Sequence, residues 1–84
     1  MQGRRLPDGS KIFAPGDYAF TDGQWHLKPP LNANGKSYVG TLGTHTVVVH
    51  EDGTITVSPS ILQQYGDDEV IWHGFLERGV WRSC

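Results

Sequence analysis

Cysteine, long hydrophobic runs and an excess of one charge are all scarce in this sequence. The only cysteine, Cys84, has no second cysteine with which to form an intramolecular disulfide, and such a chain is typical of a reducing cytoplasm. No run of about 18 apolar residues occurs that could form a transmembrane helix. Nine acidic and seven basic residues give a net charge of −2, which is typical of neither a nucleic-acid-binding protein nor an acidic mimic of nucleic acid. We therefore expect a cytoplasmic protein without a membrane or nucleic-acid partner.

Motifs for enzymatic chemistry are missing as well. No serine lies in the Gly-x-Ser-x-Gly elbow of hydrolases. The acidic segment 67–69 is typical of a solvated turn rather than of a catalytic carboxylate pair. The chain is therefore predicted not to be an enzyme and to bind no cofactor.

Metal-ligating side chains are few and widely spaced. Four histidines and Cys84 form no compact metal-binding motif, so the sequence predicts no metal site. A bound zinc ion would have to be held across strands by His50, His73 and Cys84. The alternative is structural: His50 packs beside Ile55, His73 is a half-buried strand residue, and Cys84 is a frayed end.

The length of 84 residues suits one small domain. We expect residues 1–84 to form that domain, with residues 1–10 either part of it or a flexible arm. A domain this short buries only a small core, so its stability margin is thin unless it self-associates. We therefore expect a homo-oligomer.

Glycine in turn dipeptides is abundant. Eleven glycines and five prolines interrupt the chain too often for long helices. Asp-Gly and Asn-Gly suit the left-handed backbone of a two-residue hairpin loop, so each predicts that its flanking segments pair antiparallel. These dipeptides are Asp8-Gly9, Asp22-Gly23, Asn34-Gly35 and Asp52-Gly53, with Arg78-Gly79 as a weaker fifth.

The dipeptide Asp22-Gly23 also predicts a register. A two-residue loop there pairs Phe20 with Trp25 and Tyr18 with Leu27 on one apolar face. The other face of the same hairpin is more polar. This hairpin therefore has a clear inward side.

The later hairpins are predicted on the same grounds. A two-residue loop at Asp52-Gly53 pairs His50 with Ile55 and Val48 with Val57. The last hairpin joins residues 70–76 to residues 80–82, most simply through a three-residue loop, 77–79, with its glycine left-handed. Its register is open by one residue, and one of the two choices sets His73 opposite Cys84.

Residues 58–66 carry two conflicting signals. Ser58 as N-cap, Pro59 at the first helical position and Gly66 as terminator predict a short helix over residues 59–65. The same residues are equally compatible with an extended strand. The fold expected is therefore mainly β, a small antiparallel sheet or a partly open barrel made of consecutive hairpins, with or without that helix.

The segment 40–45, Gly-Thr-Leu-Gly-Thr-His, is a candidate ligand-binding loop. It offers amides freed by glycine, hydroxyl groups and an imidazole, which together suit an anion. The alternative interpretation is an ordinary connecting loop. As a ligand site the sequence suggests Gly43, Thr44 and His45, with Arg78 and Arg82 supplied by the fold or by a second subunit.

The second half of the chain, residues 44–84, resembles a family of short phage and prophage proteins known only as a domain of unknown function. The resemblance rests on residues 50–62, with Ser-Pro-Ser-Ile at residues 58–61, and on residues 72–81, a histidine-aromatic hairpin. Longer members begin with cysteine-rich segments that look metal-binding, and this sequence has no equivalent. The resemblance implies a phage or prophage origin and supplies no activity.

These observations lead to one expected function and two alternatives. The expected function is a non-enzymatic phage accessory protein that acts on host machinery, for example a host-defence antagonist that captures a host protein or a small anionic or nucleotide ligand. The first alternative is a structural or virion-associated protein that assembles through strand edges. The second alternative is a small zinc-binding protein.

Overall fold

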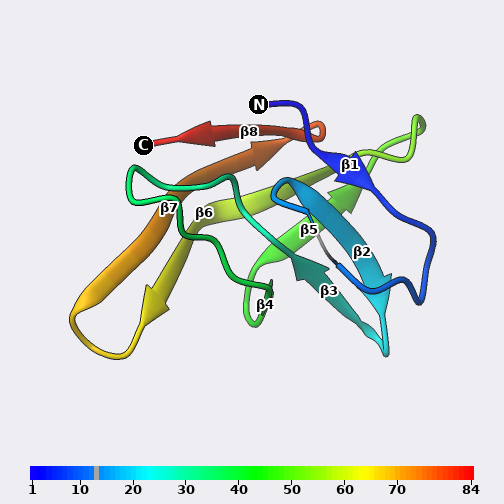
Figure 1. The fold of residues 1–84 in the computed structure, drawn as a ribbon. Coiled ribbons are helices and arrows are strands. Elements are labelled where there is room, and N and C mark those ends of the chain that lie inside the picture. Colours follow the sequence, from blue (N-terminus) through cyan, green and yellow to red (C-terminus); the bar gives the residue numbers. More distant parts are fainter. Residues whose placement is uncertain (13) are drawn as a thin grey trace.

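The computed structural model describes residues 1–12 and 14–84, which form strands and no helix. The strands make two four-stranded sheets (Figure 1). The first sheet has the order β1 (Arg4–Arg5), β2 (Asp17–Thr21), β3 (Gln24–Leu27) and β4 (Gly40–Thr41). The second sheet has the order β5 (Thr46–Val49), β6 (Ile55–Tyr65), β7 (Glu69–Glu77) and β8 (Val80–Ser83). Neither sheet closes into a barrel, and the expectation of a mainly-β fold of antiparallel hairpins is confirmed.

The two sheets share one hydrophobic core. The hairpin of β2 and β3 crosses in front of β5 in Figure 1, and buried side chains from both sheets pack together. From Trp72 onward, side chains on β7 alternate as a strand requires: Trp72 and Leu76 are buried, whereas His73 and Glu77 are exposed. The buried core cluster consists of Tyr18, Leu27, Ile55, Val57, Ile61, Trp72, Leu76 and Trp81.

The register predicted around Asp22-Gly23 is confirmed. Phe20 lies opposite Trp25 and Tyr18 opposite Leu27. Asp22 and Gly23 have φ of 53° and 77°, the left-handed pair that a two-residue type I′ loop requires. The apolar parity of the flanking residues and the turn geometry therefore specify the same pairing.

The register predicted around Asp52-Gly53 is wrong by one residue. Val47 pairs with Val57 and Val49 with Ile55, so that the loop has three residues and closes with a 2.8 Å hydrogen bond from His50 N to Thr54 O. The cause lies in the Asp52 side chain. Its Oδ1 accepts hydrogen bonds from the backbone N of Thr54 at 3.0 Å and from its hydroxyl at 2.6 Å, which stabilises a longer Asx-type turn.

The last hairpin also differs from its prediction by one residue in the loop. Glu77 pairs with Val80, so that Arg78 and Gly79 alone form a two-residue loop with φ of 46° and 75°. Gly79 is left-handed as expected, and a Cβ there would lie 2.9 Å from the Thr54 side chain. The register that sets His73 opposite Cys84 is the observed one, with Cys84 N donating to His73 O at 3.0 Å.

The helix predicted as one alternative for residues 59–65 is wrong. These residues belong to β6, which pairs with β7 from Val57 opposite Leu76 to Tyr65 opposite Glu69. The ladder shifts register between Val57 and Ile61, where Pro59 follows a cis peptide bond and has no N–H to give to a neighbour. Pairing with β7 and burial of Ile61 thus outweigh the local helix signals.

Two of the turn dipeptides form turns but no hairpins. Gly9 and Gly35 are left-handed, with φ of 86° and 73°. The segment before Asp8-Gly9 contains β1. This strand pairs in parallel with β2, and not in the antiparallel hairpin that the turn dipeptide predicts. The turn at Asn34-Gly35 lies inside the long connection between β3 and β4. A turn signal alone therefore did not specify strand pairing.

Residues 1–5 join the two sheets. Gly3 N donates to Gly79 O at 2.7 Å, and Trp81 N donates to Met1 O at 2.8 Å. Immediately afterwards β1 pairs with β2. The first part of the segment 1–10, for which a flexible arm was one expectation, is thus hydrogen-bonded to both sheets.

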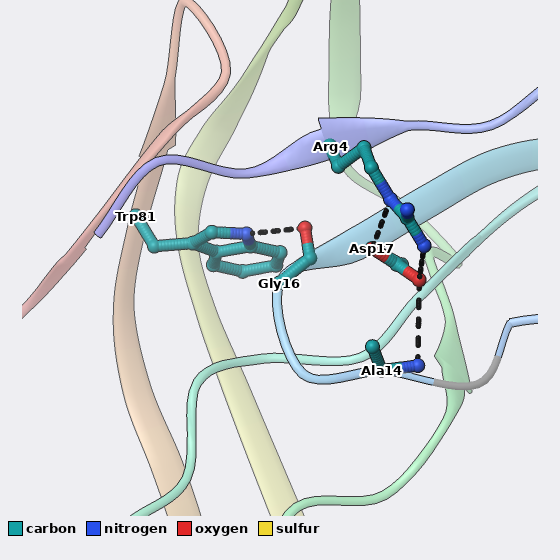
Figure 2. Close-up of polar contacts among 5 residues, drawn as sticks. All are labelled: Arg4, Ala14, Gly16, Asp17 and Trp81. Atoms are coloured by element: carbon teal, nitrogen blue, oxygen red, sulfur yellow. Dashed lines mark hydrogen bonds and ion pairs between the residues drawn. The ribbon is translucent and has the colours of Figure 1, made fainter.

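A buried carboxylate lies where this segment meets the core (Figure 2). The side chain of Asp17 is only 3% exposed and accepts two hydrogen bonds from the Arg4 guanidinium, at 3.1 and 3.0 Å. Ala14 N donates a third at 3.3 Å. Beside it, the Trp81 indole Nε1 donates to Gly16 O at 3.0 Å. Because buried charges require such partners, this group of contacts stabilises the junction of the two sheets.

Candidate functional site

A hollow of about 460 Å³ opens beside the β2–β3 hairpin and the start of β5. Its volume lies within the range of small-ligand pockets, roughly 300–1,000 Å³. Aromatic and aliphatic side chains contribute most of its large residues, and glycine exposes backbone at two places. The lining residues are Phe20, Gly23, Gln24, Trp25, Leu42, Gly43, His45 and Val47.

Trp25 is held in place by contacts on several sides. Phe20 meets it edge to face, with ring centroids 5.3 Å apart, and the Tyr18 ring lies 6.4 Å away. The guanidinium of Arg5 lies over the Trp25 ring at 5.0 Å, and Arg5 itself donates to Gly53 O at 2.9 Å. A ring fixed in this way offers a preformed apolar surface to a ligand.

His45 provides, together with Gln24, the polar side chains of this hollow. Its Nε2 lies 3.0 Å from the backbone oxygen of Ser60, which can only accept, so the neutral ring carries its proton on Nε2. The other nitrogen, Nδ1, is buried and has no hydrogen-bond partner among the residues that the structure describes. Neutral His45 therefore keeps a buried acceptor that no described residue satisfies.

Among the residues that the structure describes, no Asp, Glu, Lys or Arg side chain lines this hollow. Two other hollows are charged but not basic. One of about 570 Å³ is lined by Arg4, Arg5, Asp8 and Asp52 among others, and Arg4 is already bound to Asp17. One of about 560 Å³ has a single arginine beside two acidic side chains. None of the three has the excess of positive charge that would favour an anion.

The five predicted ligand residues are only partly brought together. Gly43 and His45 line the aromatic hollow, while the neighbouring Thr44 is exposed and does not line it. Arg78 lies in a different hollow, with His50 and Asp52. Arg82 lies on the β7–β8 hairpin, where it pairs with Glu77 and lies over the Phe75 ring at 4.8 Å.

The prediction missed the apolar part of the site. Phe20, Trp25, Leu42 and Val47 line the hollow together with His45. The pairing of Phe20 with Trp25 could be predicted from the sequence, but its closeness to His45 could not, because His45 directly precedes β5 of the other sheet.

The three residues named for a zinc site do not converge. His50 Nε2 contacts Thr56 Oγ1 at 2.6 Å, whereas His73 Nε2 contacts Ser60 Oγ at 3.1 Å and lies 4.0 Å from Cys84 Sγ. Over residues 1–12 and 14–84, no group of three or more His, Cys, Asp or Glu side chains is arranged to hold a metal ion. His73 and Cys84 alone are two ligands, and structural zinc sites use four.

One serine–histidine contact exists on the second sheet. Ser60 Oγ lies 3.1 Å from His73 Nε2, which is the distance expected between a nucleophile and a general base. Within the described part of the chain, however, no acidic side chain hydrogen-bonds to the His73 ring. The group that orients the base in a catalytic triad is thus not provided by these residues.

The side chains of Tyr18 and Asp52 have shifted pKa values. Burial raises the pKa of Tyr18 above its ordinary value of 10.0, because the phenolate would lose hydration. The side chain and backbone of Thr54 donate hydrogen bonds that lower the pKa of Asp52 below its ordinary 3.8. Neither residue lines the aromatic hollow.

The comparisons with known proteins give no match. No family model matches it, and no curated protein and no solved structure matches it. In the part of the chain that the structure covers, no helix is long and apolar enough to cross a membrane. Function must therefore be argued from the site itself.

Proposed function

We propose that this chain is a non-enzymatic binding protein that captures a host protein, with the aromatic hollow as the central contact. The observation that carries the proposal is the composition of the hollow: Phe20, Trp25, Leu42 and Val47 surround His45 without an Asp, Glu, Lys or Arg side chain. Protein interfaces are enriched in aromatic residues and depleted of charge at their centre. The resemblance to phage proteins adds the expectation that the captured protein belongs to the host's defence machinery.

The charge of the surface favours a protein over a small anion. A nucleotide or phosphate ligand would need cationic side chains that are free to bind it. Arg78 and Arg82, expected to supply them, lie away from His45, and Arg4 is bound to Asp17. An uncharged aromatic or aliphatic side chain of a partner protein fits the hollow better than a phosphate group does.

The test is comparative affinity capture from host extract with quantitative mass spectrometry. Phe20 is the residue to change, because it lines the hollow and is 37% exposed, so Phe20→Ser is expected to fold. A central aromatic contact typically contributes about 2 kcal/mol or more to binding, which corresponds to a loss of about 30-fold in affinity. The identified protein is then purified and its affinity measured by calorimetry with both forms.

The matched control is Leu62→Ser. Leu62 is 50% exposed and lies in β6, outside the aromatic hollow. A host protein retained by the wild type and by Leu62→Ser, but lost with Phe20→Ser, supports the proposal. Equal capture by all three proteins contradicts it, and nucleotide-induced NMR shifts at Gly43 and His45 would support the small-ligand alternative instead.

A second candidate is a structural or virion-associated protein. It is favoured by one observation, the exposed strand β5 at the edge of the second sheet, because open strand edges are used for assembly. Mass spectrometry of purified particles tests it. Copies of the chain in stoichiometric ratio to known particle proteins would favour this candidate over host capture.

A further inference from the structure

The strand β5 (Thr46–Val49) has a partner on one side only. It pairs antiparallel with β6 and with no other strand of the described chain. The other outer strand of this sheet, β8, is covered by the segment 1–3. Val48 and Val49 are 51% and 52% exposed, so β5 is an apolar open edge.

The backbone groups that point outward can be derived from the hairpin. His50 and Thr54 form a hydrogen-bonded pair, and hydrogen-bonded and non-hydrogen-bonded pairs alternate along an antiparallel ladder. Val48 is therefore bonded to β6, whereas the N–H and C=O of Val47 and Val49 point away from it. Open edges of this kind are normally protected by lysine, proline or a bulge, and residues 44–50 contain neither lysine nor proline.

We propose that a second copy of this chain pairs with β5, antiparallel and about a two-fold axis at Val48. Val47 of each copy then bonds to Val49 of the other, and the two Val48 side chains lie directly opposite each other. The two second sheets become one continuous eight-stranded sheet. Val47 and His45 also line the aromatic hollow, but this contact is made through the backbone of β5, so the dimer does not depend on the proposed function.

The register follows from which groups must meet. Outward-pointing residues can pair only with outward-pointing residues, which leaves a two-fold axis at Val47, Val48 or Val49. An axis at Val47 sets His45 opposite Val49, and an axis at Val49 sets Glu51 opposite Val47. Only the axis at Val48 places valine opposite valine throughout the centre of the pairing.

Residues on either side of Val48 make this edge self-complementary. About that axis, Thr46 lies opposite His50 of the second copy, and His45 lies opposite Glu51. No two like charges are brought together, because Glu51 lies opposite a histidine and not opposite another carboxylate. A second copy therefore fits this edge in apolar character, hydrogen bonding and charge. The contact is short, so the dimer is expected to dissociate on dilution.

Disulfide trapping tests the register directly. In a Cys84→Ser background, Val48→Cys places two thiols in a non-hydrogen-bonded pair with Cα atoms about 4.5 Å apart, within the span of a disulfide. Thr46→Cys is the matched control, because it is exposed on the same face of β5 but its two copies would be displaced by about 13 Å along the strand. Mild oxidation should give mostly covalent dimer for Val48→Cys and about tenfold less for Thr46→Cys.

Sedimentation at several concentrations tests the dimer itself. The wild type and Leu62→Lys should be dimeric at high concentration, and Val48→Lys should be monomeric but folded. A wild type that stays monomeric at millimolar concentration, or equal trapping of the two cysteine variants, overturns the inference. A monomer that still captures its host protein would overturn only this inference and would leave the proposed function standing.

Discussion

Gly74→Ala is expected to lower the free energy of unfolding by about 2–3 kcal/mol, because the site has no space for a methyl group. Gly74 lies in β7 opposite Ile61 and Ser83. A Cβ there would lie 2.5 Å from the Trp72 ring and 2.8 Å from Ser83 Cα, with the Arg82 carbonyl oxygen closer still. Two of these three atoms belong to the backbone of β8, so β8 itself would have to move.

Urea denaturation measures the effect, and Gly43→Ala is the control. A Cβ at Gly43 would meet nothing within 4 Å, and its backbone is not left-handed, so that substitution should change stability by less than about 0.5 kcal/mol. With a dependence of about 1 kcal/mol per molar urea for a small domain, the midpoint of Gly74→Ala should fall by about 2–3 M. Midpoints of the two variants within about 0.5 M of each other would refute the steric argument.

Three further predictions concern the junction of the sheets and two titrating groups. Trp81→Phe keeps an aromatic ring but removes the buried Nε1 donor to Gly16 O, so the free energy of unfolding should fall by about 1–3 kcal/mol in the same denaturation assay; an unchanged midpoint would contradict this. The pKa of Tyr18 is raised by burial, so its contribution to stability is complete below the ordinary pKa of 10.0 and is lost as the pH rises through the folded-state value. Tyr18→Phe should remove this alkaline loss, which urea midpoints measured across that pH range would show, and an identical loss in the variant would disprove it. The pKa of Asp52 is lowered by hydrogen bonds from Thr54, so its contribution is present above pH 3.8 and is lost as the pH falls through the folded-state value. Thr54→Val should raise the Asp52 pKa towards 3.8 in an NMR titration, and an unshifted titration curve would count against the hydroxyl contact.

Two loops with the same Asp-Gly dipeptide show how far local sequence specifies register. At Asp22-Gly23 the alternation of Tyr18 and Phe20 agrees with a two-residue loop, and the predicted pairs are observed. At Asp52-Gly53 both loop lengths bring valines together. The three-residue loop is favoured by hydrogen bonds from Thr54 to the Asp52 side chain. The alternation of apolar residues contains no information about these hydrogen bonds.

The candidate site was predictable only in its loop residues. Gly43 and His45 attract attention by residue type, and both line the aromatic hollow. Arg78 and Arg82 were grouped with them because they are cationic, yet they lie on another hairpin. Phe20 and Trp25 reach His45 only because the β2–β3 hairpin packs across β5, a contact between residues about 20 positions apart in the sequence.

The sequence by itself determined the mainly-β class, the left-handed turns and the pairing of Phe20 with Trp25. It could do so because turn geometry and side-chain alternation depend on residues close together in the chain. Tertiary structure decided that residues 59–65 are a strand, that the segment 1–3 covers β8 and that β5 stays open. These outcomes depend on which distant segments pack together when the shared core is buried. Residues that are neighbours in the sequence do not determine that packing.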